Sequence, residues 1–310
     1  MQKSSAKIKV VGVGGSGGNV VSRMAKYNIA GVDLIVINTD DQDLNKSKAN
    51  FKIRIGKKLT QGLGTGMDPD IGRRSAEEQR EDIKEILKDT DMVFIACGLG
   101  GGTGTGATPV VAEIAKSLGI LTVAVVTKPF SFEGTTRQKI AEAGLKNLKE
   151  KVDSLISISN DNLLAVLDPG ASINSAFWVC DEILKEAVAG ISDLILRPGI
   201  INVDFADVKA IMKDSGSALF GVGRSIGEKR AEVAAKAALN SPLLNVSPKG
   251  AKGVLFNVSG GKDISLSEVE EIGRILTKEI NPEAKVIFGA ISDENLKEGE
   301  IKVTVIATGF

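Results

Sequence analysis

Short apolar runs alternate with amphipathic segments along the first half of the chain. The apolar runs are rich in β-branched residues and predict strands at residues 8–13, 34–38, 51–55, 92–96, 121–127 and 154–159. Apolar residues at helical spacing lie between them and predict helices, for example at residues 17–27, 69–87 and 108–118. Because several runs lack polar positions, these strands are expected to be buried on both faces. Alternating strands and helices indicate an α/β fold with a doubly wound parallel sheet.

The second half of the chain follows a different pattern. One face of residues 173–196 is apolar at helical spacing, which predicts a single long helix ended by Arg197, Pro198 and Gly199. At 1.5 Å per residue this helix would span roughly 36 Å, enough to join two domains. Further helices are predicted at 204–213, 228–239 and 267–279, and strands at 253–258, 285–291 and 301–308. We therefore expect an α/β domain over residues 1–171, a central helix and connector over 172–200, and a smaller α+β domain over 201–310.

Composition and charge argue against several classes of function. Lys+Arg and Asp+Glu are both 39, and this zero net charge argues against non-specific binding to nucleic acid or to membrane surfaces. The chain has no histidine, which removes imidazole bases, nucleophile pairs and metal ligands. Cys97 and Cys180 form no Cys-x-x-Cys motif and are expected to be buried thiols. With neither a signal-peptide pattern nor an 18-residue apolar stretch, a cytoplasmic protein without direct membrane insertion is expected.

Two glycine-rich segments each join a predicted strand to a predicted helix. The first glycine loop, residues 12–19, reads Gly-Val-Gly-Gly-Ser-Gly-Gly-Asn, and the second glycine loop, residues 98–106, has six glycines in nine. Backbone N–H groups of such a loop, at the positive end of a helix, can close around a phosphate. The second glycine loop contains no lysine or arginine, so amides rather than side-chain charge would hold a phosphate there.

The first glycine loop alone also suits a dinucleotide. It contains Gly12-x-Gly14-x-x-Gly17, and Asp40 follows the next strand, as in nicotinamide and flavin enzymes. One pyrophosphate does not need two amide cradles, whereas a triphosphate would use both. A Walker lysine loop is absent, which disfavours ordinary P-loop enzymes.

Polar residues near predicted strand ends are further candidates for binding. Asn38 and Asp40 end a strand where ligands of open α/β sheets bind, although they also suit a helix-capping turn. Glu133 and Arg137, spaced four apart, either pair with each other on a helix or contact ribose and phosphate. Asn160 ends the strand at 154–159 and would read a base.

Acidic residues on and after the long helix also allow two interpretations. Asp181 lies beside Phe177 at the edge of the apolar stripe, where a carboxylate either faces water or accepts two N–H bonds from guanine. Asp204 and Asp207 follow the long helix, about a helix length from the glycine loops. They either cap a new helix or polarise a water molecule, but not at the nucleotide of their own chain.

Taken together, these segments resemble the tubulin/FtsZ family of GTPases over nearly the whole chain. Thr105 favours its FtsZ branch, the bacterial cell-division GTPases, because tubulins carry serine there. The resemblance rests on Gly-Gly-Gly-Thr-Gly-Thr-Gly at 100–106, Val-Gly-Gly-Ser-Gly-Gly-Asn at 13–19, Asn-Thr-Asp at 38–40, Pro-Phe-Ser-Phe-Glu-Gly at 129–134, Asn-Asp at 160–161, Phe177 with Asp181, and Asn-Val-Asp-Phe-Ala-Asp at 202–207.

The resemblance implies a division of labour within the site. The glycine loops would hold phosphates, Glu133 and Arg137 the ribose end, and Asn160, Phe177 and Asp181 the guanine. The residues assigned to GTP or GDP are Gly14, Gly15, Ser16, Gly17, Gly18, Asn19, Asn38, Asp40, Gly101, Gly102, Thr103, Gly104, Thr105, Glu133, Arg137, Asn160, Phe177 and Asp181. Mg²⁺ would be held mainly by the phosphates, so no metal-binding side chains are expected, and a role for a monovalent cation stays open.

The same resemblance implies a self-assembling enzyme. Asn202, Asp204 and Asp207, here called the acidic loop (residues 202–207), would insert into the nucleotide site of the next subunit and orient the attacking water. Such a head-to-tail contact does not close and propagates a filament, here a homopolymer of the division ring in the cytoplasm. Family members usually continue into a tail that binds membrane anchors and regulators, and these partners are expected through such a tail, which is absent from a sequence ending at Phe310.

The sequence also departs from the family pattern and leaves other functions open. Ser159 replaces a usual proline, Asn162 an arginine and Cys180 an alanine, and Asp41 adds an acid, which leaves the geometry of the base-binding loop open. A related tubulin-like GTPase for plasmid segregation or cell shape is one alternative. A nicotinamide-dependent oxidoreductase is another, but it leaves the second glycine loop unexplained. A non-catalytic regulator that binds GTP would not require the acidic loop.

Overall fold

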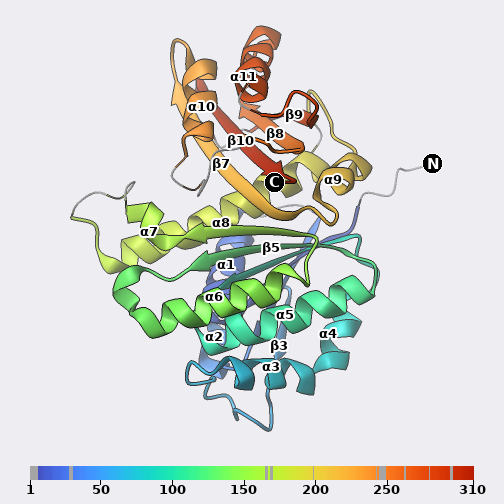
Figure 1. Ribbon diagram of the computed structural model, residues 1–310, viewed down its shortest axis with the longest axis vertical. Coiled ribbons are helices and arrows are strands. Elements are labelled where there is room, and N and C mark those ends of the chain that lie inside the picture. The colour runs from blue at the N-terminus through green and yellow to red at the C-terminus, as the bar shows by residue number, and fades with distance from the viewer. Residues whose placement is uncertain are drawn as a thin grey trace. The chain divides into compact units, whose positions relative to one another are not determined.

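The chain divides into two units, Met1–Ala189 and Gly190–Phe310 (Figure 1). The computed structural model describes residues 6–27, 31–164, 167, 170–197, 199–241, 243, 249–261, 263–278, 280–293 and 296–310. The division falls within the long helix α8 (Ile173–Leu196), whose bounds are those predicted. Pro198, predicted to end this helix, lies outside the described residues. The predicted domain limits at residues 171 and 200 stay predictions.

A parallel sheet forms the centre of the first unit. Its strands lie in the order β3-β2-β1-β4-β5-β6, and every neighbouring pair is parallel. The predicted doubly wound parallel sheet is therefore confirmed. The strand bounds are β1 (Ile8–Val13), β2 (Val32–Asn38), β3 (Phe51–Arg54), β4 (Met92–Gly98), β5 (Leu121–Lys128) and β6 (Ser154–Ser159).

Helices cover both faces of this sheet. Val11 and Val13 of β1 join an apolar cluster with residues of α3–α6, whereas Gly12, between them, faces Val21 of α1. Alternate residues of one strand thus pack on opposite layers, which explains why the strands lack polar positions. The helices of this unit are α1 (Gly14–Tyr27), α2 (Asp41–Lys46), α3 (Pro69–Glu78), α4 (Arg80–Leu87), α5 (Gly102–Ser117), η1 (Ser131–Glu133), α6 (Thr135–Lys149), α7 (Asn160–Leu163) and most of α8.

Three helix predictions need correction. The predicted helix at 69–87 is two helices separated at Gln79, which is buried and whose Oε1 accepts a hydrogen bond from the Gly56 N–H at 2.6 Å. Helix α1 begins at Gly14 rather than residue 17, and α5 begins at Gly102 rather than near residue 107. In both cases residues of the glycine loop form the first turn of the helix. The last glycine of each loop therefore does not mark where the helix begins.

The second unit is an α+β layer. Its sheet has the order β7-β10-β8-β9, with β10 antiparallel to β7 and β8, and β8 parallel to β9. Alanines of α10 and apolar residues of α11 pack on β8 and β10 to form its core. The elements are α9 (Phe205–Met212), β7 (Gly216–Ile226), α10 (Arg230–Leu239), β8 (Gly253–Gly260), α11 (Leu266–Lys278), β9 (Lys285–Ser292) and β10 (Glu300–Thr308). Glu279, the predicted end of α11, lies outside the described residues.

Strand β7 lies where the sequence pattern predicts no strand. A Cβ on Gly221 would lie 2.3 Å from the Ala238 carbonyl oxygen, and one on Gly223 would lie 2.0 Å from that of Ala234. The strand is therefore glycine-rich because α10 packs directly on its backbone. This close approach removes the β-branched side chains by which a strand is recognised in sequence.

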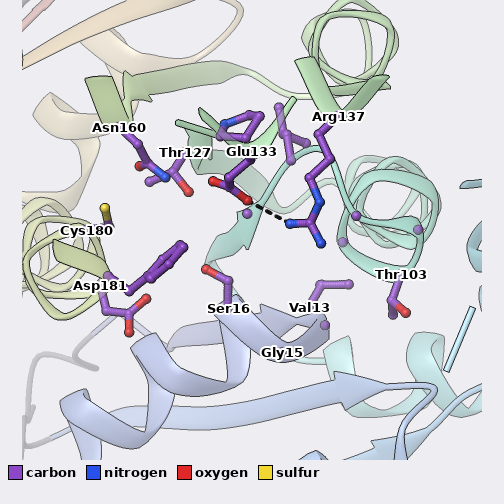
Figure 2. Close-up of a pocket in the computed structure, with 18 of the residues that line it drawn as sticks. Val13, Gly15, Ser16, Thr103, Thr127, Glu133, Arg137, Asn160, Cys180 and Asp181 are labelled. Carbon is purple, nitrogen blue, oxygen red and sulfur yellow. Dashed lines mark hydrogen bonds and ion pairs between the residues drawn. The ribbon is translucent and has the colours of Figure 1, made fainter. Parts of the chain in front are cut away.

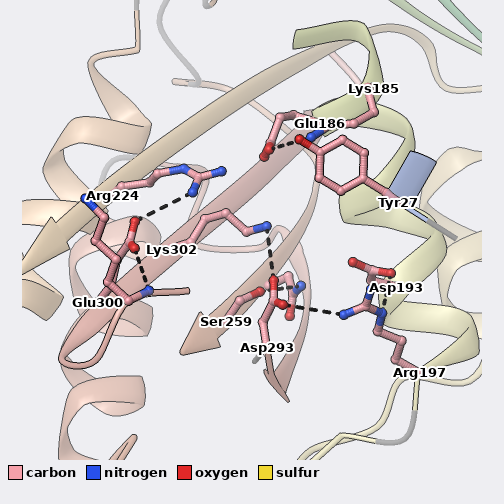
Figure 3. A network of polar contacts seen from close by, with 12 residues as sticks. Tyr27, Lys185, Glu186, Asp193, Arg197, Arg224, Ser259, Asp293, Glu300 and Lys302 are labelled. Carbon is pink, nitrogen blue, oxygen red and sulfur yellow. Dashed lines mark hydrogen bonds and ion pairs between the residues drawn. The ribbon is translucent and has the colours of Figure 1, made fainter. Parts of the chain in front are cut away.

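Charged side chains of the second unit form ion pairs at the end of α8 (Figure 3). Arg197 contacts Asp193 at 2.8 Å and Asp293 at 3.7 Å, and Lys302 contacts Asp293 at 3.8 Å. These pairs tie the last turn of α8 to the ends of β9 and β10 within the second unit. Among the described residues, no helix is long and apolar enough to cross a membrane.

Candidate functional site

A pocket of about 300 Å³ lies at the carboxyl ends of β1, β4, β5 and β6 in the first unit (Figure 2). This is the edge at which open α/β sheets bind ligands. The sequence-predicted residues that line it are Gly14, Gly15, Ser16, Gly101, Gly102, Thr103, Gly104, Glu133, Arg137, Asn160, Phe177 and Asp181. The structure thus brings together residues from both glycine loops, α6, α7 and α8.

The two glycine loops place two helix N-termini at this pocket. Helix α1 begins at Gly14 and α5 at Gly102, and both residues line the pocket. A Cβ on Gly101 would meet no atom within 4 Å, so the backbone there borders open space. The first-turn N–H groups of both helices have no partner within the helix, and they favour an anion. The arrangement fits a chain of phosphates without side-chain cations.

Threonines connect the second glycine loop to its surroundings. The Thr103 hydroxyl lies 2.7 Å from that of Thr39 and 3.4 Å from that of Thr65. Thr105 is buried, and its hydroxyl accepts a hydrogen bond from the Gly100 N–H at 2.9 Å. Thr105 therefore shapes the loop from behind and does not line the pocket, whereas Thr103 does.

The end of the pocket farthest from Thr103 has the chemistry of a base site. Figure 2 shows Asn160 and Asp181 at this end. Asn160 is 5% exposed, and its Oδ1 has no hydrogen-bond partner within the described protein. Phe177 is 40% exposed and meets Phe130 edge to face, with ring centroids 5.5 Å apart. A buried amide oxygen without a partner beside a half-exposed ring is what a planar polar ligand would complete.

Asp181 is a buried carboxylate with one cationic partner. The residue is 6% exposed, so it does not face bulk water, and Oδ2 lies 3.2 Å from Nη2 of Arg23. Burial raises the pKa of Asp181 to about 6, and the nearby Arg23 opposes this rise. At neutral pH the group is therefore ionised and accepts hydrogen bonds.

Glu133 and Arg137 pair with each other, and their contact with ribose and phosphate stays a prediction. Arg137 Nη1 lies 2.7 Å from Glu133 Oε2. Gly134 separates η1, which ends at Glu133, from α6, so the pair does not lie on a single helix as one interpretation of the sequence had it. Glu133 Oε1 also accepts a hydrogen bond from the Phe130 N–H at 2.9 Å, and both residues line the pocket. The pair is thus held in place at the wall of the cavity.

Several predicted residues lie outside the pocket. Gly17 lies against β4, where a Cβ would lie 2.4 Å from the Ala96 carbonyl oxygen, and Asp40 caps α2 by accepting hydrogen bonds from the N–H groups of Gln42 and Asp43. The glycine spacing and the acid that suggested a dinucleotide therefore have local structural roles. The predicted residues that do not line the pocket are Gly17, Gly18, Asn19, Asn38, Asp40 and Thr105.

The sequence prediction missed other lining residues. They are Val13, Thr65, Gly98, Leu99, Thr127, Pro129 and Cys180. Most stand at or directly after the ends of predicted strands, which is the signal that would have found them. Thr65 lies in a loop where Gly62, Gly64 and Gly66 all have positive φ. Glycines at this spacing indicate a backbone conformation that other residues rarely adopt.

The acidic loop belongs to the second unit. Asn202 Oδ1 accepts a hydrogen bond from the Gly199 N–H at 2.7 Å, and Asp204 precedes α9 at its N-cap position. Asn202, Asp204 and Asp207 are exposed. Every residue that lines the pocket lies in the first unit, so the pocket and the acidic loop belong to different units.

Cysteine and acidic side chains offer little metal chemistry. Cys97 and Cys180 are free and buried, as predicted, and burial raises the pKa of each thiol to about 12. Both thiols are therefore protonated at neutral pH. Within the described part of the chain, no three or more Cys, Asp or Glu side chains are grouped to hold a metal ion.

Comparison with known proteins defines the class. Residues 7–168 match the Tubulin/FtsZ family GTPase domain, and residues 216–310 match the FtsZ family C-terminal domain. The chain therefore belongs to the Tubulin/FtsZ family, as its motifs predicted, and it carries both the GTPase domain of that family and the C-terminal domain of its FtsZ branch.

Solved structures agree with this assignment. An empty dimer of FtsZ from M. jannaschii is 50% identical, with a TM-score of 0.96 over 99% of this chain and 89% of that chain. A mutant of the same protein gives the same identity and TM-score over 99% and 92%. The GTPγS-bound protofilament of CetZ2 from Haloferax volcanii is 23% identical, with a TM-score of 0.81 over 97% and 92%, and shows a shared fold.

Proposed function

We propose that this protein assembles head to tail into filaments of the division ring and hydrolyses GTP at the contact between subunits. The observation that supports the proposal is that the pocket and the acidic loop belong to different units of the chain. The pocket lies in the first unit, and the acidic loop lies in the second. Membership of the Tubulin/FtsZ family supports GTP hydrolysis in general, and the M. jannaschii FtsZ structure is a dimer.

The phosphates would be held by backbone amides of the two glycine loops. Gly14–Ser16 and Gly101–Gly104 would contact them directly, since these residues line the pocket. Gly17, Gly18 and Asn19 would act within α1, and Asn38 and Asp40 would hold the turn that carries Thr39 to Thr103. The pocket wall offers hydroxyls rather than grouped carboxylates, so Mg²⁺ would be held mainly by phosphate oxygens, whose charge it would neutralise.

The nucleoside would lie at the other end of the pocket. Glu133 and Arg137 would contact the ribose, and Phe177 would cover one face of the base. Asp181 would accept hydrogen bonds from the two adjacent N–H donors of guanine, which adenine lacks. Asn160, whose Oδ1 has no partner in the described protein, would complete the recognition of the base.

Hydrolysis would require two subunits. Asp204 and Asp207 of one subunit would orient and polarise the water that attacks the terminal phosphate held by its neighbour. Asn202 would set the path of the acidic loop through its hydrogen bond with Gly199. The products are GDP and phosphate, and loss of the γ-phosphate would weaken the contact between subunits. Membrane anchors and regulators at the division site would be further partners.

The first test measures phosphate release and light scattering together as the protein concentration rises. The expected result is a threshold concentration below which neither signal appears, because the site is complete only in a filament. Turnover that is strictly proportional to protein, without scattering, would show a complete site in each monomer and would contradict the proposal.

A variant separates binding from hydrolysis. Asp207→Ala should bind GTP and assemble, but its turnover should fall by about 10²-fold or more, because a group that positions and polarises the attacking water is lost. Asp33→Ala, an exposed aspartate of β2, is the matched control and should leave turnover unchanged. Normal turnover of the Asp207 variant within filaments would remove this residue from the mechanism and would favour GTP as a structural ligand.

A further inference from the structure

Arg23 on α1 holds the carboxylate that faces the base end of the pocket. Its Nη2 lies 3.2 Å and its Nε 3.4 Å from the same oxygen, Oδ2 of Asp181. A carboxylate has about four acceptor positions on its two oxygens. Arg23 therefore leaves room on Asp181 for two N–H groups of a base.

Trp178 fixes the other side of the same guanidinium. The Arg23 guanidinium lies 5.2 Å from the centre of the Trp178 ring, within the range of a cation–π contact. Trp178 and Asp181 are three residues apart on α8, so both face α1 from one side of the helix. The Arg23 guanidinium therefore contacts both an aromatic ring and a carboxylate of α8, and the two contacts together restrict its position.

The balance of charge around Asp181 depends on this arginine. Burial acts against the ionised carboxylate, and Arg23 is the group that opposes it. Among the residues that line the pocket, the other titratable groups are the protonated Cys180 thiol and the paired Glu133 and Arg137. Further along α1 and α8, Lys185 pairs with Glu182 and Glu186 and lies over the ring of Tyr27. None of these supplies an unpaired positive charge that would replace Arg23.

We propose that Arg23 is a positioning residue for nucleobase recognition, which keeps Asp181 ionised and oriented and thereby sets the preference for guanine. This inference rests on the proposed function, because it assigns the base to the end of the pocket at Asp181. Arg23 itself does not line the pocket, so it acts through Asp181 and not by contact with the nucleotide.

The experiment uses Trp178, the single tryptophan of the chain, as its reporter. Its fluorescence, checked by equilibrium dialysis, gives the Kd for GDP and for IDP, whose base lacks the 2-amino donor. In Arg23→Gln the pKa of Asp181 should rise. Once this pKa exceeds the working pH, each further pKa unit weakens GDP binding by about tenfold. IDP binding should weaken less, so the ratio of the two Kd values should move toward one.

Three comparisons distinguish positioning from a general loss of structure. The ratio of the GDP Kd of Arg23→Gln to that of the parent protein should fall as pH rises from about 7 to 8.5, because Asp181 then ionises even without Arg23. Arg23→Lys keeps the charge and should retain most of the affinity. In an Asp181→Asn background, Arg23→Gln should add little. Lys26→Gln, an exposed change on the same helix, is the matched control.

Two failures are distinguishable. If the parent protein binds neither nucleotide, the proposed function fails. If the parent binds GDP but Arg23→Gln leaves both Kd values unchanged, or weakens GDP and IDP equally at every pH, the positioning role of Arg23 is overturned while the proposed function stands.

Discussion

At the scale of single residues, the pocket combines groups that are costly to bury without a ligand. Asp181 is a carboxylate that is 6% exposed, and the buried Asn160 amide oxygen has no hydrogen-bond partner among the residues that the structure describes. Both groups reduce the stability of the empty protein, and under the proposed function a base would supply the missing hydrogen bonds. The motifs of the family located both residues, but only the structure shows that Asp181 has a partner on α1.

Asp181→Asn should therefore stabilise the empty protein at neutral pH. The pKa of Asp181 in the fold, about 6, lies above the ordinary 3.8, so the native protein loses stability as pH rises through this interval. The neutral amide avoids this loss, and the free energy of unfolding should rise by about 1–3 kcal/mol at pH 7. Urea unfolding at several pH values measures it.

The stability gain of this variant has a clear signature. It should vanish below about pH 4, where the parent carboxyl is protonated in both states. Asp33→Asn, on the exposed start of β2, is the control and should show no such dependence. A gain that persists at low pH would mean that the amide stabilises the fold by another route.

At the scale of elements, the sequence predicted most of the strands and helices because their apolar periods are strong. The failures at glycines share a cause, which is close approach of backbones, whereas the division of the predicted helix 69–87 lies at the buried Gln79. Strand β7 carries glycines where α10 lies on it, and α5 begins inside the second glycine loop. A glycine that serves helix packing looks the same in a sequence as one that serves a turn. Only contacts between distant segments separate the two.

Gly106 gives a test of this argument. A Cβ there would lie 1.9 Å from the Pro69 carbonyl oxygen and 2.7 Å from the Arg73 nitrogen, both in the backbone of α3. Because backbone cannot move aside as a side chain can, Gly106→Ala should destabilise the first unit by about 1–3 kcal/mol or more. The midpoint of thermal or urea unfolding measures this.

The matched control is five residues away in the same loop. Gly101→Ala would place its Cβ where no atom lies within 4 Å, and its φ of −93° suits any residue. Because Gly101 is the N-cap of α5 and alanine caps less well than glycine, the stability of this variant should fall by only about 0.5–1 kcal/mol. Because Gly101 lines the pocket, the same variant should weaken nucleotide binding. Equal unfolding midpoints for the two variants would contradict the packing argument.

At the scale of the whole molecule, the pocket and the acidic loop that we propose for hydrolysis belong to different units. The pocket belongs to Met1–Ala189, and Asp204 and Asp207 belong to Gly190–Phe310. The sequence analysis also places the glycine loops and the acidic loop in different predicted domains, 1–171 and 201–310. A contact between the pocket of one subunit and the acidic loop of another is heterologous, so each added subunit presents a new pocket or a new loop.

Mixing two inactive variants tests this division directly. Asp181→Asn should prefer XTP, because its amide donates to the carbonyl that xanthine carries in place of the 2-amino group of guanine. The Asp181→Asn variant has an intact acidic loop, but its pocket no longer binds GTP well. Asp207→Ala keeps a GTP pocket but a defective loop. With GTP and XTP both present, the mixture should produce GDP, although neither variant does so alone.

The amount of GDP formed follows from the arrangement of subunits. In a random copolymer of equal parts, about one quarter of the contacts join a GTP pocket to an intact loop, so GDP formation should approach about one quarter of the parent rate. XTP turnover by Asp181→Asn alone, with a concentration threshold, shows that this variant assembles. If it assembles and the mixture still forms no GDP, the two residues act within one chain, and the filament is not needed to complete the site.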